Sequence, residues 1–296
     1  MNLSISLITC SLICIFVIFI FICVNLKKND KTINKKELFG NDDIIMVHNS
    51  YLSDKNENTE IKWISNNTCT YVKDNWPNTL DWDYNIKKDI IQQSLKIPNN
   101  SAIIDAGAHI GDGVIPIAHA LKYHGRDDIE VVAIEPCQTK CEFIRKLCEI
   151  NNLDNVNIIN TGISDKKKIL KKGRLPFWWN IINNTGAVKW YSDDDKPLYD
   201  KITDIFMSEQ TKEHISCDTI DNLVSQRKIK HPIRLIHLDL EGGERDALIG
   251  ASKTLDKYKP YLSVEFEYLS SIKHINYIPS IYKQTKQINR NLIYQI

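Results

Sequence analysis

The sequence predicts an α/β fold in which a mostly parallel β-sheet carries helices on both of its faces. Short, largely apolar runs at 102–108, 130–135, 156–163, 234–240 and 261–267 have the length of β-strands. Such runs are typical of parallel strands that are buried on both faces. Stretches with helical periodicity lie between them, so strand and helix alternate along the chain and predict a covered parallel sheet. These stretches are 113–124, 137–151 and 244 to about 258, and one more amphipathic helix is expected at 83–95.

Composition fits a globular domain of ordinary size and argues against two kinds of site. The chain has 296 residues, of which 43% are hydrophobic, and its formal net charge is +1. So small an excess of positive charge is not typical of a nucleic-acid-binding protein, and no nucleic-acid partner is expected. The eight cysteines show no paired metal-ligand spacing, since Cys137 and Cys141 are four apart, like neighbours on one helix face. We therefore expect reduced cysteines and no zinc site.

The N-terminal segment is predicted to be a membrane anchor. Residues 5–26 carry no charge and are long enough to cross the hydrocarbon core of a bilayer as one helix. A secretory signal peptide is the alternative, but no basic segment precedes this run and no small-residue cleavage site follows it. The expected organisation is a transmembrane anchor at 1–26, a polar linker at 27–62 and a folded domain at 63–296.

Charges beyond the apolar run predict how the chain lies in the membrane. A group of lysines follows the run closely, and by the positive-inside rule it favours a single-pass protein whose folded domain is cytoplasmic. Glycosylation sequons at Asn66, Asn99 and Asn183 favour the opposite, luminal side. The lysines are Lys27, Lys28, Lys31, Lys35 and Lys36.

The stretch 165–215 interrupts the alternation of strands and helices. It is polar and contains the aromatic residues Trp178, Trp179, Trp190 and Tyr191. We expect a β-hairpin or a lid over the ligand site here, and a plain surface insertion is the alternative.

The most informative motif joins the first predicted strand to its helix. Gly107 and Gly111 allow positive φ angles and a close approach of the main chain to a ligand. The motif differs from the dinucleotide signature G-x-G-x-x-G, because His109 stands where the second glycine belongs. Asp105 and Asp112 make the loop acidic, which disfavours a pyrophosphate and suits a cationic ligand such as a sulfonium amino acid. Asp105 could hold the ammonium group of that ligand.

Two further elements extend the predicted ligand site along the ends of the strands. Glu135 ends the second predicted strand, about thirty residues after Asp105, where a carboxylate can accept hydrogen bonds from both hydroxyls of an adenosine ribose. The alternative role for Glu135 is that of an acid at a helix N-terminus. Pro136 stops the strand. Ser164 and Asp165 end the third predicted strand, where they could meet the adenine amine or cap a turn.

Several sequence blocks, in this order, resemble the FkbM family of S-adenosylmethionine-dependent methyltransferases. The resemblance spans about 91–267 and is most specific around Asp239, where the family typically reads I-D-V-E-G-x-E. It implies a Rossmann-like class I methyltransferase fold with S-adenosyl-L-methionine as cofactor. The chain departs from the family pattern with His109 for Asn, His237 for Lys, and Gly243 for Ala or His. The blocks are 105–113, 133–136, 162–165, 218–223, 237–244 and 260–265, and the cofactor-binding residues are expected to be Asp105, Gly107, Ala108, His109, Gly111, Glu135, Pro136, Ser164 and Asp165.

The catalytic residues are expected at the end of the fourth predicted strand. Asp239 lies where the transferable methyl group is expected and could act as a general base or orient an acceptor, with Glu241 as a second orienting acid. His237 shares one strand face with Asp239 and is a further candidate, although a hydrogen-bonded core histidine is the alternative. Asp239 could instead be a structural acid. Glu244 is interpreted as a first-turn helix acid and Glu265 as one more site candidate, and no ligand spacing requires a metal ion.

Together these features predict a membrane-bound O-methyltransferase that uses S-adenosylmethionine. The expected acceptor is a hydroxyl of a glycan, glycolipid or small molecule, because the family often methylates such groups and the anchor brings the site near a membrane. An NAD-dependent oxidoreductase is disfavoured, since the sequence has neither the glycine signature nor a fitting Tyr-x-x-x-Lys element. The remaining alternative is an inactive methyltransferase-like module that is tethered to the membrane.

Overall fold

The computed structural model describes six stretches of the chain: 44–49, 60–65, 84–172, 190–191, 214–265 and 275–296. The predicted anchor at 1–26, the linker up to residue 43 and much of the 165–215 insertion lie outside these stretches, so those predictions stay predictions. Within the six stretches, no helix is long and apolar enough to cross a membrane.

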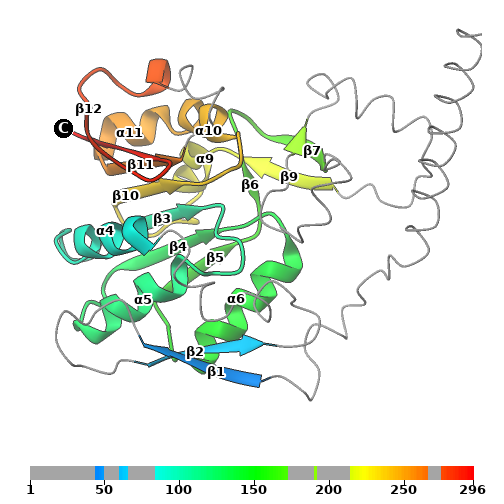
Figure 1. The fold of residues 1–296 in the computed structure, drawn as a ribbon. Helices are drawn as coiled ribbons and strands as arrows, with labels where there is room; N and C mark the ends of the chain where they lie inside the picture. Colours follow the sequence, from blue (N-terminus) through cyan, green and yellow to red (C-terminus); the bar gives the residue numbers. More distant parts are fainter. Residues whose placement is uncertain (1–43, 50–59, 66–83, 173–189, 192–213, 266–274) are drawn as a thin grey trace, which may run out of the picture. The chain divides into compact units, whose positions relative to one another are not determined.

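A seven-stranded sheet forms the centre of the fold (Figure 1). Its five strands from β5 to β11 run parallel, and β13 is antiparallel to both of its neighbours. The chain winds outward in both directions from β3 and β10, so a topological switch point lies between these two strands, where ligands of such sheets bind. Across the sheet the strands are β5 (Val156–Ile159), β4 (Glu130–Ile134), β3 (Ala102–Ala106), β10 (Ile233–Leu238), β11 (Tyr261–Glu265), β13 (Asn291–Gln295) and β12 (Lys283–Ile288).

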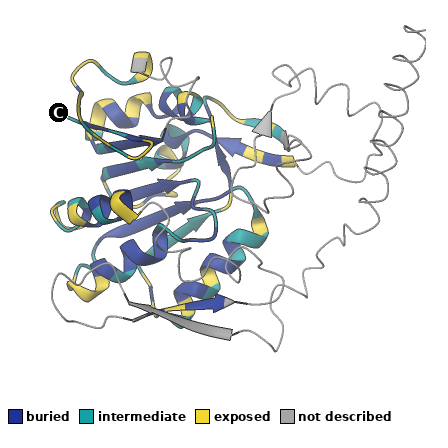
Figure 2. Cartoon of the chain, in the orientation of Figure 1, coloured by how far each residue is buried: buried dark blue, intermediate teal, exposed yellow. Residues whose placement is uncertain are grey.

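Helices cover both faces of this sheet, as the alternation along the sequence predicts. Strands β3 and β4 are buried along their whole length (Figure 2). On one face, Ile104, Leu238 and Val264 join a core cluster with side chains of the covering helices. This face carries α9 (Ile220–Ser225), α10 (Glu244–Gly250) and α11 (Ser252–Tyr258), and the other carries α4 (Tyr84–Ser94), α5 (Val114–Tyr123) and α6 (Gln138–Ile150) (Figure 1).

The predicted strand at 156–163 is divided between two sheets, which corrects the sequence-based expectation. Strand β5 ends at Ile159, and Asn160 then donates hydrogen bonds to the carbonyl oxygens of Glu135 and Pro136, both at 2.9 Å. These bonds hold the chain as it leaves β5 for a second, four-stranded sheet. In that sheet β7 and β8 pair antiparallel, which agrees with a hairpin in the insertion, whereas a lid stays a prediction. Its strands lie in the order β6 (Gly162–Ile163), β9 (His214–Asp218), β7 (Lys168–Lys172) and β8 (Trp190–Tyr191).

The predicted helix from 244 to about 258 is two helices, so this prediction is wrong. Between α10 and α11, Ala251 has φ −108° and ψ 3°, outside the helical range. Gly250 lets the end of α10 approach the second sheet, since a Cβ there would lie 2.1 Å from the carbonyl oxygen of Ser164. The apolar periodicity continues across the break because Leu248 and Leu255 are buried in the same core cluster.

A two-stranded antiparallel sheet lies partly in the range predicted to be a linker. It consists of β1 (Ile44–Asn49) and β2 (Glu60–Ser65), so an irregular linker up to residue 62 is not what the structure has. The reason is that β2 packs against α5 and α6. Trp63 is fully buried and meets Phe143 edge to face, with 6.2 Å between the ring centroids, and the Asn151 side chain exchanges hydrogen bonds with the main chain of Lys62.

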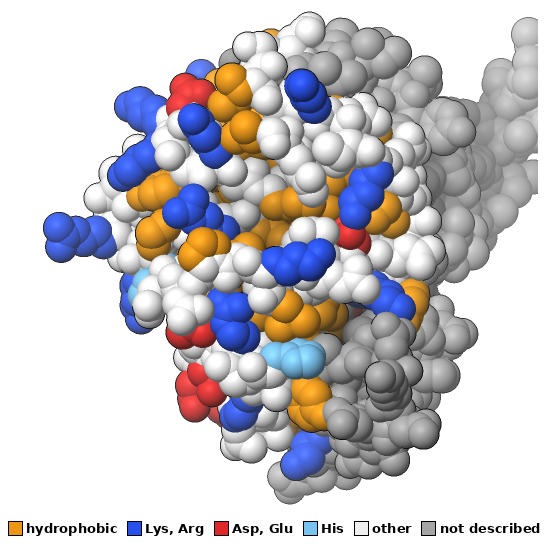
Figure 3. All heavy atoms as spheres, turned by 90° about the vertical axis from the view of Figure 1, so that its left-hand side faces the viewer, with side chains coloured by type: hydrophobic (Ala, Val, Ile, Leu, Met, Phe, Trp, Pro, Cys, Tyr) orange, Lys and Arg blue, Asp and Glu red, His pale blue; other side chains and the backbone are white. Residues whose placement is uncertain are grey.

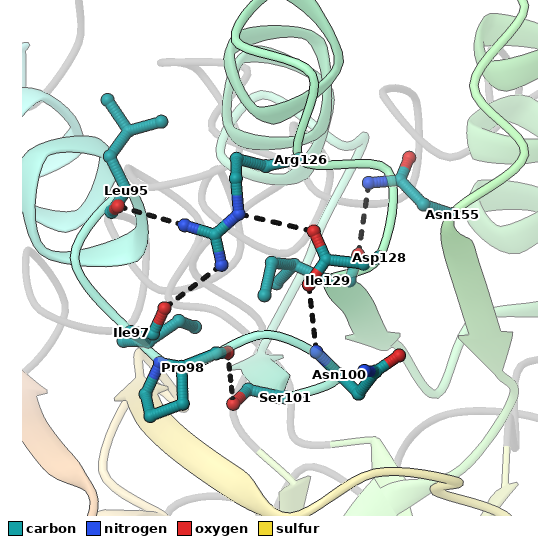
Figure 4. A network of polar contacts seen from close by, with 9 residues as sticks. All are labelled: Leu95, Ile97, Pro98, Asn100, Ser101, Arg126, Asp128, Ile129 and Asn155. Atoms are coloured by element: carbon teal, nitrogen blue, oxygen red, sulfur yellow. Dashed lines mark hydrogen bonds and ion pairs between the residues drawn. The ribbon is translucent and has the colours of Figure 1, made fainter.

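The segments that lead into β3 and β4 are tied together by Arg126 (Figure 4). Its guanidinium group donates to the carbonyl oxygens of Leu95 and Ile97, both at 2.9 Å, and to Asp128 at 3.2 Å. Asp128 in turn accepts a hydrogen bond from the main-chain N–H of Asn100 at 2.8 Å. The network therefore fixes how the two parallel strands begin, at the end of the sheet opposite the predicted site.

Candidate active site at the carboxyl ends of the strands

Gly107 brings the loop after β3 into contact with the end of β10. Its φ angle is +91°, and a Cβ at this position would lie 1.8 Å from the carbonyl oxygen of Asp239. The main-chain N–H of Asp239 donates to the carbonyl oxygen of Ala106 at 3.0 Å. On the other side, the N–H groups of Gly107 and Ala108 both donate to the carbonyl oxygen of Ile134. The predicted cofactor loop and the predicted catalytic residue therefore share main-chain contacts.

The next residues turn the loop back toward α5. His109 has φ +49° and Gly111 has φ +88°, so two nearby positions are left-handed, and Gly111 also donates to the carbonyl oxygen of Ala108 at 2.7 Å. A Cβ at Gly111 would lie 3.1 Å from Ile144 and 3.3 Å from Ile115, which leaves little room for a side chain. The expected need for glycine at 107 and 111 is confirmed by these angles.

Glu135 follows β4 and is held by main-chain N–H groups on both sides. One carboxylate oxygen accepts from Cys137 at 2.9 Å, and the other accepts from His109 at 3.0 Å. Only 5% of the residue is exposed. Each carboxylate oxygen can accept more than one hydrogen bond, so this arrangement positions Glu135 and leaves acceptor capacity for a ligand.

Asp105 is a buried acid on β3 beside the glycine loop. Burial raises its pKa to about 6; Asp112 and Asp239 raise it further, whereas His237 and Lys87 oppose the rise. Gly113 makes room for it, since a Cβ there would lie 2.8 Å from Oδ2 of Asp105.

The neighbouring Asp112 behaves in the opposite way, although it also lies in this loop. Burial raises the pKa of Asp112, but Lys87 and His109 outweigh burial and bring it below the usual range. Lys87 lies on α4, and its Nζ is 2.9 Å from an oxygen of Asp112. The two acids therefore differ in charge at mildly acidic pH, with Asp112 ionised before Asp105. Sequence analysis did not identify Lys87, which lies far from the loop along the chain.

His237 belongs to a polar row that crosses the sheet below the loop. It pairs in register with Asp105 on one side and with Ser263 on the other. Its Nδ1 lies 3.1 Å from Oγ of Ser263, which in turn contacts Oδ1 of Asn291 at 3.3 Å. His237 is therefore hydrogen-bonded, as the alternative role expects, but it is only partly buried and so is not a core residue.

Asp239 and Glu265 form an acidic pair two residues farther along the strands. Glu265 ends β11 and is only 2% exposed. Burial raises its pKa strongly, and a hydrogen bond with the side chain of Asp239 raises it further. Arg290, from the turn between β12 and β13, lies 2.6 Å from Oε1 of Glu265 and was not identified from the sequence. Glu265 is buried, whereas the face of the molecule drawn in Figure 3 carries more basic than acidic side chains on its surface.

The loop after Asp239 is held by a buried acid at the start of α10. Glu241 has φ +51° and Gly242 has φ +104°, so the loop makes a left-handed turn. Oε1 of Glu244 accepts hydrogen bonds from the N–H groups of Leu240 at 2.7 Å and Gly242 at 3.3 Å. Glu244 is 1% exposed, and burial raises its pKa to about 7. Its role goes beyond that of a first-turn helix acid, because it fixes the loop that carries Glu241.

Ser164 and Asp165 have partners in another part of the fold. The Ser164 hydroxyl lies 3.2 Å from an oxygen of Asp165 and 3.4 Å from one of Asp246 on α10. Lys168 links the same two acids at 2.8 and 2.9 Å. Both residues thus tie the second sheet to α10, in agreement with the alternative of a local structural role. Pro136 lies beside Glu135, and its carbonyl oxygen accepts from Asn160.

A recess of about 470 Å³ lies beside the second sheet and contains none of the predicted site residues. Its lining includes Lys167, Lys228, Ser216 and Asp218. Lys167 lies 3.7 Å from Asp218, so part of its charge is already balanced. Across the described stretches, no group of three or more His, Cys, Asp or Glu side chains could hold a metal ion.

A family model decides the assignment that the motif and the site geometry suggest. The model described as the methyltransferase FkbM domain matches residues 105–286, which is more than half of the chain. The chain belongs to the FkbM methyltransferase family. The resemblance inferred from the sequence blocks is therefore confirmed.

Two solved structures are similar to this FkbM-family chain. One is methyltransferase FkbM from Methylobacillus flagellatus, with a TM-score of 0.40 and 19% identity over 66% of this chain and 43% of the other. The match thus spans less than half of that protein. The second is precorrin-6y C5,15-methyltransferase from Geobacter metallireducens, with a TM-score of 0.34 and 12% identity over 70% of this chain and 85% of the other. No curated protein matches the chain significantly.

Proposed function

We propose that this protein transfers the methyl group of S-adenosylmethionine to a hydroxyl at the carboxyl ends of β3, β4 and β10. The observation that carries the proposal is the position of Glu135 and Asp105 on either side of the left-handed glycine loop. Glu135 offers a fixed carboxylate to the ribose hydroxyls, and Asp105 offers a buried carboxylate to the ammonium group. The carboxylate of Asp105 suits the cationic ammonium group of this cofactor, and the carboxylate of Glu135 suits its neutral ribose hydroxyls, which are hydrogen-bond donors.

The remaining cofactor contacts follow from the same loop. Gly107 and Gly111 let the loop turn with positive φ angles at the carboxyl end of β3, and Ala108 and His109 lie between them. Pro136 would border the ribose beside Glu135. We also assign contacts with the adenine to Ser164 and Asp165. Within the protein, the Ser164 hydroxyl contacts Asp165 and Asp246, and Asp165 accepts a hydrogen bond from Lys168. The residues proposed for the cofactor are Asp105, Gly107, Ala108, His109, Gly111, Glu135, Pro136, Ser164 and Asp165.

The chain's own contribution to methyl transfer is alignment and proton removal. When bound, S-adenosylmethionine supplies a methyl carbon that its sulfonium group already activates. Alignment of an acceptor with that carbon can lower the barrier by about 7–11 kcal/mol. We assign to Asp239 the removal of the acceptor's hydroxyl proton, and to Glu241 a hydrogen bond that orients the acceptor. His237 lies below them, between Asp105 and Ser263 in the sheet register, and its Nδ1 contacts the hydroxyl of Ser263.

The proposed acceptor is a hydroxyl of a glycan, glycolipid or small molecule. The basis is the family membership together with the uncharged run at 5–26, which would keep the site close to a membrane in a single-pass, cytoplasm-facing arrangement. An inactive, membrane-tethered module is the second candidate. It would not need the two acids, whereas Asp105 and Glu135 are both present and Glu135 is held by main-chain N–H groups, which favours an active enzyme.

Cofactor binding by the full-length protein, purified in a mild detergent, tests the proposal directly. Calorimetric titration with S-adenosylmethionine and S-adenosylhomocysteine should give micromolar affinity. Asp105→Asn and Glu135→Gln should each weaken binding at least about tenfold, because each removes a charged hydrogen-bond acceptor. Asp127→Asn, an exposed acid away from the site, is the matched control and should bind like the wild type.

The pH dependence of the same titration adds a second test. Only ionised Asp105 attracts an ammonium group, so affinity should fall as the pH drops through about 6, and Asp105→Asn should remove this dependence. A folded wild-type protein that binds neither compound would refute the methyltransferase proposal and favour the inactive module.

A further inference from the structure

Lys87 is a buried lysine on α4, a helix that precedes the range matched by the family model. Helix α4 packs against α5, which the loop after β3 leads into (Figure 1). The ammonium nitrogen of Lys87 lies 2.9 Å from Oδ2 of Asp112 in that loop, and the two side chains are only 8% and 16% exposed. Lysine is almost never fully buried unless it is paired, so this ion pair ties α4 to the cofactor loop.

The carboxylate of Asp112 contacts the loop with its other oxygen. Oδ1 lies 3.6 Å from Nδ1 of His109, while Oδ2 faces Lys87. His109 has φ +49°, a left-handed angle that is uncommon for a residue with a side chain and persists only where the surroundings hold it. Asp112, itself held by Lys87, contributes to those surroundings.

The main chain of His109 carries the connection on to Glu135. Its N–H group donates to Oε2 of Glu135 at 3.0 Å, and the N–H group of Cys137 holds Oε1 at 2.9 Å. The backbone angle at His109 therefore decides where one of the two donors to this carboxylate points. Contacts run without a gap from α4 through the loop to the end of β4, and they join Lys87, Asp112, His109 and Glu135.

We propose that Lys87 is a positioning residue for the cofactor's ribose, because it fixes the carboxylate of Glu135 through Asp112 and His109. The inference rests on the proposed function, in which Glu135 accepts hydrogen bonds from the ribose hydroxyls. Lys87 acts only through the loop, and α4 becomes a supporting part of the cofactor site.

Two ligands that differ by one ribose hydroxyl test this role in the full-length protein in mild detergent. They are S-adenosylhomocysteine and its 2′-deoxyribose analogue, compared by calorimetric titration. The wild type should bind the analogue at least about tenfold more weakly, because the analogue lacks a donor to a charged acceptor. Lys87→Met removes the ammonium group and keeps an apolar stem, and it should lower this discrimination to about threefold or less.

Two single substitutions show whether the effect belongs to the charge at this position. Lys88→Met is the matched control, since Lys88 is the next residue on α4 and its ammonium lies 6.0 Å from the centroid of the Tyr84 ring. It should discriminate between the ligands like the wild type. Lys87→Arg keeps a cation beside Asp112 and should retain most of the discrimination, whereas a loss as large as in Lys87→Met would contradict the role of the ion pair.

A double variant separates positioning from simple neutralisation of a buried charge. Lys87→Met combined with Asp112→Asn leaves no unpaired buried charge, so the free energy of unfolding should recover relative to Lys87→Met. The discrimination should stay low, because nothing then ties the loop to α4. Recovery of both would overturn the proposal, since Lys87 would only neutralise Asp112. If Lys87→Met does not fold, the discrimination of the double variant still decides the question.

The same titrations distinguish this inference from the proposed function. A wild type that discriminates between the ligands, with Lys87→Met doing so equally well, would overturn the role of Lys87 and leave the methyltransferase proposal intact. A wild type that binds both ligands equally would overturn the inference at Glu135. A folded wild type that binds neither would overturn the proposed function, and the positioning role with it.

Discussion

Glu244 should make the fold less stable as the pH rises through neutrality, and Glu244→Gln should remove this effect. The side chain is 1% exposed, and its Oε1 accepts from the N–H groups of Leu240 and Gly242. Oε2 is buried and has no hydrogen-bond partner in the structure. Glutamine preserves an oxygen that can accept both main-chain bonds, while it cannot ionise.

The magnitude follows from the pKa of Glu244 in the folded and unfolded protein. Burial raises it from 4.5 to about 7, and one pKa unit corresponds to about 1.4 kcal/mol, so the effect is about 3 kcal/mol. Between these two values the folded protein holds a proton that the unfolded protein has released, and stability falls with rising pH. The loss begins near pH 4.5 and is complete above about pH 7.

Denaturant unfolding of the full-length wild type and Glu244→Gln, at several pH values from about 4.5 to 8, measures the effect. The free energy of unfolding of the variant minus that of the wild type should rise by about 3 kcal/mol over this range. Glu149→Gln, an exposed site on α6, should show a flat difference. A flat difference for Glu244→Gln as well would refute the reasoning, because Glu244 would then ionise equally in both states.

Three substitutions test separate parts of the fold. Gly107→Ala should cost about 2–4 kcal/mol of unfolding free energy and weaken cofactor binding, because the methyl group meets the carbonyl of Asp239; unchanged stability and affinity would contradict the contact. Arg126→Ala should cost about 2–3 kcal/mol through lost hydrogen bonds while calorimetric affinity for the cofactor stays the same. Trp63→Ala should cost about 3–5 kcal/mol if β2 packs on Phe143 as observed, and a loss below about 1 kcal/mol would argue against that packing.

The sequence predicts the central strands well, because a strand that is buried on both faces consists of a continuous run of mostly apolar residues. The apolar runs that became β3 and β4 are fully buried. Strand β12 has no such trace, since KQTKQI is polar and mostly exposed at the edge of the sheet. The break at Ala251 is equally invisible, because both helices bury the same side and periodicity runs through it. Tertiary packing, rather than local preference, decides these elements.

The candidate site was predictable where a residue's role is set by neighbours along the chain. The left-handed angles of Gly107 and Gly111 follow from the loop motif itself. Partners that come from distant elements were missed, such as Lys87 on α4 and Arg290 in the last hairpin. The structural engagement of Ser164 was also hidden, because it depends on α10 passing close by. Pairings of this kind follow only from the three-dimensional topology.

The contact at Gly107 couples the position of the loop after β3 to the position of the end of β10. With the carbonyl of Asp239 lying where a side chain would start, neither strand end can be repositioned without the other. A substitution that shifts the end of β3 must therefore be matched by a shift at the end of β10.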